Sequence, residues 1–322
     1  MRLYRTWIFW VLTCACLTIT AVPQSFGQDS FTQRDIVNSG TVGIISGGIS
    51  GTYVRVASDL SNALDDGYDH RVLAILGKGS IRNIEDLLLL RGIDIAIVQS
   101  DVLEFYRTTG LFPNIARQVN YVTKLYNEEV HLVARDDITN VGDLKGRKVN
   151  FGSQGSGTFM TASVIFDALG IDIDVTTDPD PIALEKLRNG EIDALVFVGG
   201  KPVSLLVQVA NEDNLKLLSI PLARVKGPYL AATLGAADYP ALVEPGQNVS
   251  TVAVGAVLAA YNWGEDNPRR EKVTNFVNRF FDGFDTFLQA PYHPKWQEVD
   301  IRADLPGWRR LASAKDWLAA HP

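Results

Sequence analysis

The stretch TVGIISGGISGTYVRVASDLSNAL, residues 41–64, decides which fold we expect for this chain. An apolar run rich in β-branched residues is followed by a loop of glycine and serine, and then by a helical pattern that ends near Leu64. This order predicts a strand over 41–45, a glycine-rich loop, and a helix. Strand-loop-helix units of this kind build parallel α/β sheets.

The same unit occurs a second time, in KVNFGSQGSGTFMTASVIFDALG at 148–170. Both copies place Ser-Gly-Thr-aromatic at the start of the helix, at 50–53 and at 156–159. Each copy continues with a strand, a helix and a further strand, since LLRGIDIAIVQSD (89–101) matches KLRNGEIDALVFVGG (186–200). This internal repetition predicts two similar lobes in preference to one continuous sheet.

Two further apolar stretches are expected to connect the lobes. YVTKLYNEEVHLVARDD at 121–137 leads from the first copy into the second, and STVAVGAVLAAY at 250–261 can run back. Two crossings of this kind form a hinge. Helical patterns from Pro268 to Leu288 and from Pro306 to Ala320 are expected to pack on the first lobe.

Composition excludes several classes of protein. With 322 residues, of which 46% are hydrophobic and 21% charged, the chain has enough apolar material for one large or two medium cores. The net charge of −7 has the wrong sign for holding nucleic acid. The four histidines are scattered, and motifs for metal sites, serine nucleophiles and nucleotide loops are absent from the sequence. We therefore expect no metal, no cofactor, no catalytic residue and no enzymatic activity.

The first 27 residues are predicted to be a signal peptide. A cationic start is followed by an almost uniformly apolar run over 7–22, and small residues favour cleavage before Gln28. The alternative is an uncleaved membrane anchor, although the run is slightly short for a bilayer. Both cysteines, Cys14 and Cys16, lie inside this run, so cleavage leaves an acidic exported chain without disulfides. Its charge suits a soluble monomer.

Loops rich in glycine and hydroxyl groups recur at the carboxyl ends of the predicted strands, where ligands of open α/β sheets bind. Glycine lets the backbone approach a ligand closely, and the free N–H groups at a helix start favour an anion. Each loop alone can be a simple strand-to-helix turn, but recurrence in two facing lobes favours a ligand cleft. The loops are 46–53, 77–83, 99–101, 152–158 and 199–201.

Three charged residues in these loops have two possible roles each. Lys78 and Lys201 can meet an anionic ligand across the cleft, or they can be solvated loop lysines. Asp101 can hold an ammonium group of a ligand, or it can cap the helix expected from residue 102 onward.

The chain resembles the TAXI family, periplasmic solute receptors of the TRAP-associated type. The resemblance covers nearly the whole chain after the signal peptide, and it depends on motifs that occur in the expected order. They are SGGISGTY (46–53), GKGSIRNIEDL (77–87), AIVQSD (96–101), LYNEEVHLVAR (125–135), GDLKGRKVNFGSQGSGT (142–158), LRNGEIDALVFVGG (187–200) and TVAVGAVL (251–258).

The resemblance implies an α/β, two-lobed periplasmic-binding-protein fold of the type II-like kind, with two lobes joined by a two-strand hinge. The expected organisation is a signal peptide at 1–27, lobe 1 at 28–131, lobe 2 at 132–237, and a return to lobe 1 with a helical tail at 238–322.

By the same resemblance, the protein is a periplasmic, monomeric receptor that closes on a small anionic solute and delivers it to a TRAP-type permease. Family members are associated with amino acids and dicarboxylates such as glutamate or 2-oxoglutarate. An alternative is a periplasmic sensing subunit for a membrane receptor kinase. Together with the two lysines, the residues expected around the ligand are Ser50, Thr52, Tyr53, Lys78, Ser80, Gln99, Ser100, Tyr126, Gln154, Ser156, Gly157, Thr158 and Lys201.

Overall fold

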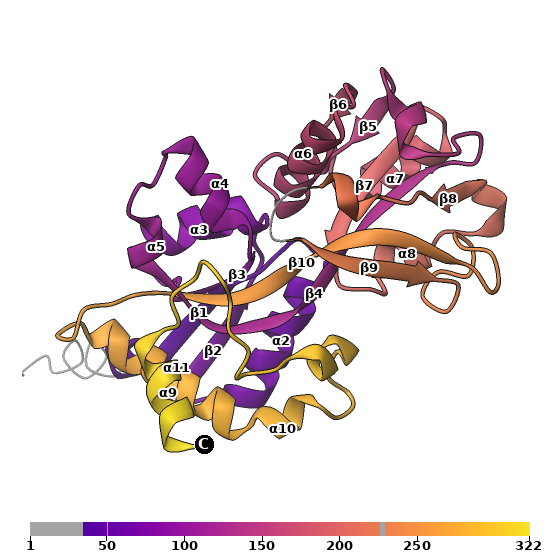
Figure 1. Ribbon diagram of the computed structural model, residues 1–322. Coiled ribbons are helices and arrows are strands. Elements are labelled where there is room, and N and C mark those ends of the chain that lie inside the picture. Colours follow the sequence, from indigo (N-terminus) through magenta and orange to yellow (C-terminus); the bar gives the residue numbers. More distant parts are fainter. Residues whose placement is uncertain (1–34, 50, 226–228) are drawn as a thin grey trace, which may run out of the picture.

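The computed structural model describes residues 35–49, 51–225 and 229–322, and within them the chain forms two α/β lobes (Figure 1). The signal peptide predicted for residues 1–27 lies outside these residues. The strands are β1 (Thr41–Ile45), β2 (Arg71–Ile75), β3 (Ile95–Gln99), β4 (Val119–Arg135), β5 (Lys148–Asn150), β6 (Asp174–Thr176), β7 (Ala194–Gly199), β8 (Leu215–Leu217), β9 (Leu230–Gly235) and β10 (Asn248–Tyr261).

Helices connect most of these strands, as the sequence pattern predicts. They are α2 (Thr52–Leu64), α3 (Ser80–Leu89), α4 (Val102–Thr109), α5 (Ile115–Gln118), α6 (Gly157–Leu169), α7 (Asp180–Arg188), α8 (Ser204–Val207), α9 (Pro268–Asp282), α10 (Phe284–Phe287) and α11 (Ala312–Ala320). In the described residues no helix has both the length and the apolar character needed to cross a bilayer.

The predicted repeat is confirmed in the strand pairing. In the first copy β1 pairs in parallel with β2 and β3, and in the second copy β5 pairs in parallel with β6 and β7. In both copies the middle strand leads into the helix that begins with the Gly-Thr-aromatic sequence, α2 or α6. The two lobes therefore present equivalent strand ends to each other.

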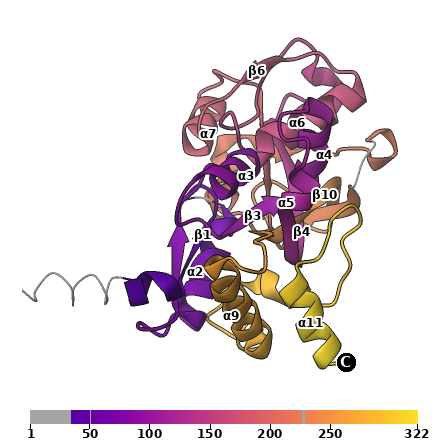
Figure 2. The same ribbon diagram turned by 90° about the vertical axis from the view of Figure 1, so that its left-hand side faces the viewer.

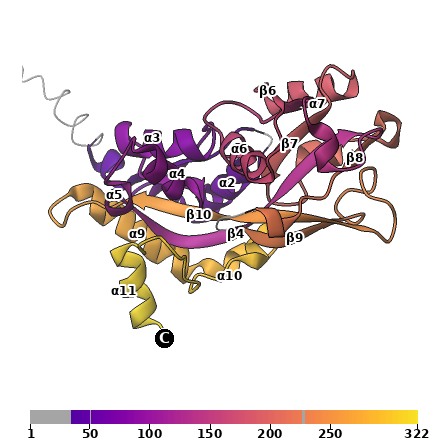
Figure 3. The ribbon, with the colours of Figure 1, turned by 45° about the horizontal axis from the view of Figure 1, so that its top comes forward.

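The two lobes are present as predicted, but their strands belong to one continuous sheet, which the sequence analysis did not favour. In the described residues the strand order is β2-β1-β3-β10-β4-β7-β5-β6, with β8 paired to β4 and β9 to β10. The long strands β4 and β10 pair antiparallel with each other, and β10 also pairs with β3 and β9, whereas β4 also pairs with β7 and β8. Figure 3 shows both strands running through the whole molecule. The predicted crossings are thus a hydrogen-bonded ribbon.

Each lobe buries apolar side chains on both faces of the sheet. In the first lobe, which we define as β1–β3 with α2–α5 and α9–α11, Val42 and Ile44 face a core under α2 and α9, while Ile45 faces a core under α3 and α4. In the second lobe, β5–β8 with α6–α8, one core lies under α6 and the other under α7 and α8. Alternating side chains of the strands produce this three-layer arrangement.

The C-terminal segment packs on the first lobe, as predicted (Figure 2). Trp296 is 1% exposed, and its Nε1 donates to Asp59 Oδ2 of α2 at 2.8 Å. Two boundaries differ from the prediction. The helix from Pro268 ends at Asp282, and the one expected from Pro306 begins only at Ala312, because the backbone at 309–311 hydrogen-bonds to Tyr121 instead.

Candidate ligand-binding cleft

A cavity of about 490 Å³ lies between the two lobes. The first lobe contributes the loops after β1 and β2 and the end of β3, and the second lobe contributes the loops after β5 and β6 and the end of β7. The crossing strand β4 contributes Glu128. The cavity therefore lies where the carboxyl ends of strands from both repeats meet, which is the usual ligand site of such sheets.

Four helices begin at this cavity: α2 at Thr52, α3 at Ser80, α6 at Gly157 and α7 at Asp180. The residues before α2 and α3 are glycines, so no side chain occupies the free N–H groups at these two helix starts. At α6 the Ser156 hydroxyl accepts a hydrogen bond from the Phe159 N–H at 3.0 Å. The N-termini of α2, α3 and α6 at one cavity make it favourable for an anionic group, whereas α7 begins there with an acid, Asp180.

The lobes touch each other at the inner end of this cavity. The Arg82 N–H of α3 donates to the Gly155 carbonyl at 3.1 Å, and the Thr52 hydroxyl donates to the Gly200 carbonyl at 3.2 Å. A Cβ atom on Gly157 would lie 2.0 Å from Gln99 Oε1, so only glycine allows this approach of α6 to the first lobe. Figure 2 shows α6 beside the α3 and α4 end of the first lobe.

Two carboxylic acids line the same cavity. Glu128 is 2% exposed, and its Oε2 accepts a hydrogen bond from the Tyr53 hydroxyl at 2.6 Å. Burial raises the pKa of Glu128 to about 8, against the opposing effect of that hydrogen bond. Burial also raises the pKa of Asp180, to about 6. A positively charged ligand group beside these carboxyls would offset the free-energy cost of ionising them away from water.

Nine of the thirteen residues expected around the ligand line the cavity. They are Thr52, Tyr53, Lys78, Ser80, Gln99, Gln154, Ser156, Gly157 and Thr158. Ser50 lies outside the described residues. Sequence reasoning missed Glu128 and Asp180, and the one signal for Glu128 was the pair of adjacent acids in a predicted crossing strand.

Three expected residues do not line the cavity. The Ser100 hydroxyl accepts a hydrogen bond from the Gly255 N–H at 3.3 Å, which ties the end of β3 to β10. Tyr126 is buried beside the cavity, and its hydroxyl has no hydrogen-bond partner among the described residues. The remaining residue is Lys201.

Lys201 faces its own lobe, which is a correction to its expected place in the cleft. Its Nζ donates to the Thr233 carbonyl at 2.8 Å and to Asp238 Oδ2 at 3.0 Å. After β7 ends at Gly199 the chain turns so that this side chain points toward β9, and the local acid satisfies its charge. Lys78 is thus the one lysine or arginine that lines the cavity within the described part of the chain.

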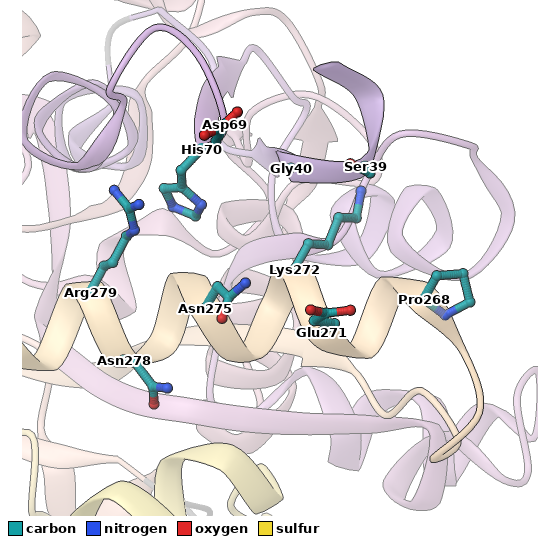
Figure 4. A pocket seen from close by; sticks show the side chains of 10 residues that line it. All are labelled: Ser39, Gly40, Asp69, His70, Pro268, Glu271, Lys272, Asn275, Asn278 and Arg279. Carbon is teal, nitrogen blue, oxygen red and sulfur yellow. The ribbon is translucent and has the colours of Figure 1, made fainter. Parts of the chain in front are cut away.

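A second cavity, of about 420 Å³, lies on the first lobe between α9 and the turn before β2 (Figure 4). Lys272 and Arg279 line it, but Lys272 forms an ion pair with Asp94 and Arg279 forms one with Asp66. It receives no residue of the second lobe. We therefore assign ligand binding to the cavity between the lobes. The described residues hold no group of three or more histidine, cysteine, aspartate or glutamate side chains arranged for a metal ion.

Comparison with known families matches residues 44–300, most of the chain, to the family described as NMT1-like. The chain belongs to the NMT1-like family. The matched region spans the motifs around the cavity, from β1 to the segment after α10.

Solved structures share the fold of this family member at low sequence identity. The periplasmic binding protein BugD is 13% identical, with a TM-score of 0.51 over 81% of this chain and 88% of BugD. MatC from Rhodopseudomonas palustris with bound malate is 16% identical, with a TM-score of 0.48 over 77% of this chain and 86% of MatC. The likeness to BugD confirms the predicted two-lobed periplasmic-binding-protein fold.

Proposed function

We propose that this chain is the solute-binding protein of a TRAP-type transporter, that it belongs to the TAXI type, and that it binds an acidic amino acid between its lobes. The observation that carries the proposal is the convergence of the N-termini of α2, α3 and α6 and one buried acid, Glu128, on a single cavity. Helix N-termini favour the carboxylates of a ligand, and Lys78 adds one positive charge.

The two acids that line the cavity favour an amino acid over a dicarboxylate. Glu128 and Asp180 would repel a ligand with carboxylates alone, or they would have to stay protonated beside it. An ammonium group on the ligand gives Glu128 a partner of opposite charge, while the helix starts receive the carboxylates.

The rest of the proposal follows from this role. The protein is a binding protein rather than an enzyme, acts as a periplasmic monomer after removal of residues 1–27, and delivers its solute to a membrane permease. We propose lobe boundaries at 28–131, 132–237 and 238–322. Most residues of each core come from one lobe and the crossing strands, which supports these boundaries. The exceptions are Met160, which joins a core of the first lobe, and Tyr239, Leu242 and Val243, which join a core of the second lobe.

Calorimetric titration with L-glutamate and 2-oxoglutarate tests the proposal, because the two differ mainly in an ammonium group against a keto oxygen. We expect L-glutamate to bind, and to bind more tightly than 2-oxoglutarate. Lys78→Met should weaken L-glutamate binding roughly tenfold, since a charge-assisted hydrogen bond is lost. Lys145→Met, at an exposed lysine of the second lobe, is the matched control and should change nothing. Tighter binding of 2-oxoglutarate, or unchanged affinity in Lys78→Met, would refute the assignment.

A further inference from the structure

We propose that Asp101 holds the two lobes together in the ligand-free protein and acts as a positioning residue that sets how readily the cleft opens. Asp101 follows β3 in the first lobe. Its Oδ2 accepts one hydrogen bond from the Thr161 hydroxyl of α6 at 3.1 Å and another from the Tyr229 hydroxyl at 3.1 Å. Both donors pack with the second lobe, α6 directly and Tyr229 in the core beneath it.

Neither role expected from the sequence uses this carboxyl group. Asp101 precedes α4, yet its side chain makes no capping hydrogen bond to that helix. It does not line the cavity between the lobes, so it is not placed to receive an ammonium group of a ligand there. Its two described side-chain hydrogen bonds both come from residues packed with the other lobe.

The surroundings of Asp101 offer no positive charge. The residue is 6% exposed, and its Oδ1 is buried without a hydrogen-bond partner in the described structure. No lysine or arginine of the described residues forms an ion pair with Asp101. The charged group that interacts with it electrostatically is another acid, Glu128 of β4, whose pKa the Asp101 carboxyl raises. The groups facing it from β3 and α6 are neutral, namely Gln99 and Thr161. An ionised Asp101 is therefore poorly compensated while the lobes are joined.

Opening the cleft separates Asp101 from Thr161 and Tyr229 and admits water. Burial raises the pKa of Asp101 to about 6 in the joined state, whereas a hydrated aspartate has a pKa near ~3.9. The joined state thus binds the proton more tightly, so acid favours joined lobes and their association weakens as the pH rises from about 4 to about 6. Two pH units correspond to a change of roughly 100-fold in the equilibrium.

The Arg82 N–H reports directly on this equilibrium. It lies in the first turn of α3, and its backbone partner is the Gly155 carbonyl of the second lobe at 3.1 Å. The neighbouring Asn83 N–H bonds to the Gly79 carbonyl of its own lobe at 2.8 Å. Separation of the lobes exposes the first amide and leaves the second protected. Because no ligand is needed, this inference can be tested whether or not the proposed function is right.

The test is residue-resolved hydrogen exchange on the ligand-free protein between pH 4 and 8. At pH 7 we expect Asp101→Asn, which keeps the shape but stays neutral, to slow exchange at Arg82 by up to roughly 100-fold, and at pH 4 to match the wild type. Combined Thr161→Val and Tyr229→Phe should speed exchange at Arg82 at every pH. Asn83 should not respond in either variant.

Ser163→Ala on the same helix is the matched control, because that hydroxyl donates to the Phe159 carbonyl within α6. It should behave as the wild type. Since Glu128 and Asp180 also titrate in the cleft, the comparison between Asp101→Asn and the wild type isolates the contribution of Asp101. Equal Arg82 exchange rates in the wild type and Asp101→Asn at pH 7, or in the wild type and the double variant, would overturn the inference.

Discussion

Replacing Glu128 by glutamine should abolish a proton release that accompanies amino-acid binding. With a pKa of about 8, Glu128 is roughly nine-tenths protonated at pH 7 before the ligand arrives. An ammonium group beside the carboxyl favours its ionised form, so binding should release up to about 0.9 proton per ligand. Asp180, with a pKa of about 6, can add only about 0.1 proton at this pH. Affinity should accordingly rise as the pH increases from 6 to 8 and level off above it.

Titration calorimetry of L-glutamate at pH 7, in buffers with different ionisation enthalpies, measures this release directly. The slope of the observed enthalpy against the buffer enthalpy gives the number of protons, which should fall from about 1.0 in the wild type to about 0.1 in Glu128→Gln. Titration of 2-oxoglutarate should show no comparable release, because it carries no ammonium group. A slope near zero in the wild type, or the same slope in both proteins, would refute the placement of the ammonium group at Glu128.

Two further predictions concern stability and lobe contact. Lys272→Met removes the Nζ that lies 2.7 Å from the fully buried Asp94, so it should lower the free energy of unfolding, measured by urea denaturation, by roughly 3 kcal/mol. Lys315→Met, at an exposed position, is the control and should leave this free energy unchanged. Equal denaturation midpoints for Lys272→Met and the wild type would contradict the prediction. Gly157→Ala places a Cβ only 2.0 Å from Gln99 Oε1, so the affinity for ligand should fall tenfold or more while the melting temperature stays nearly unchanged. An unaltered calorimetric affinity would show that the Gln99 side chain can move aside.

The elements around the cleft could be predicted from the sequence because they are buried parallel strands. Such strands appear as short, continuous apolar runs bounded by glycine-rich loops, and the strand predicted at 41–45 agrees with β1 to the residue. The repeat added a second, independent indication, since an ambiguous run in one copy has a clear counterpart in the other. Short edge strands such as β8 and β9 carry no such pattern, and the sequence did not indicate them.

The parts of the site that escaped prediction depend on contacts between residues far apart in the chain. Lys201 forms an ion pair with Asp238, which lies 37 positions later in the chain. Glu128 accepts a hydrogen bond from the Tyr53 hydroxyl, and these two residues are 75 positions apart. Loop composition shows that a lysine is near a strand end, but not which acid it meets. The shared sheet has the same origin, because among the described strands it is the pairings of β3 with β10, β10 with β4, and β4 with β7 that join the sheets of the two repeats.

The arrangement of the cores determines the order in which the two lobes can fold during synthesis. Both cores of the second lobe are assembled from residues between Val130 and Val254. The larger core of the first lobe joins Val42 to residues as late as Ala314. A chain that emerges from its N-terminus can therefore complete the second lobe while the apolar face of β1 to β3 still lacks α9 and Trp296 and is open to wrong partners. The part of the protein that is synthesised first is the part that finishes folding last.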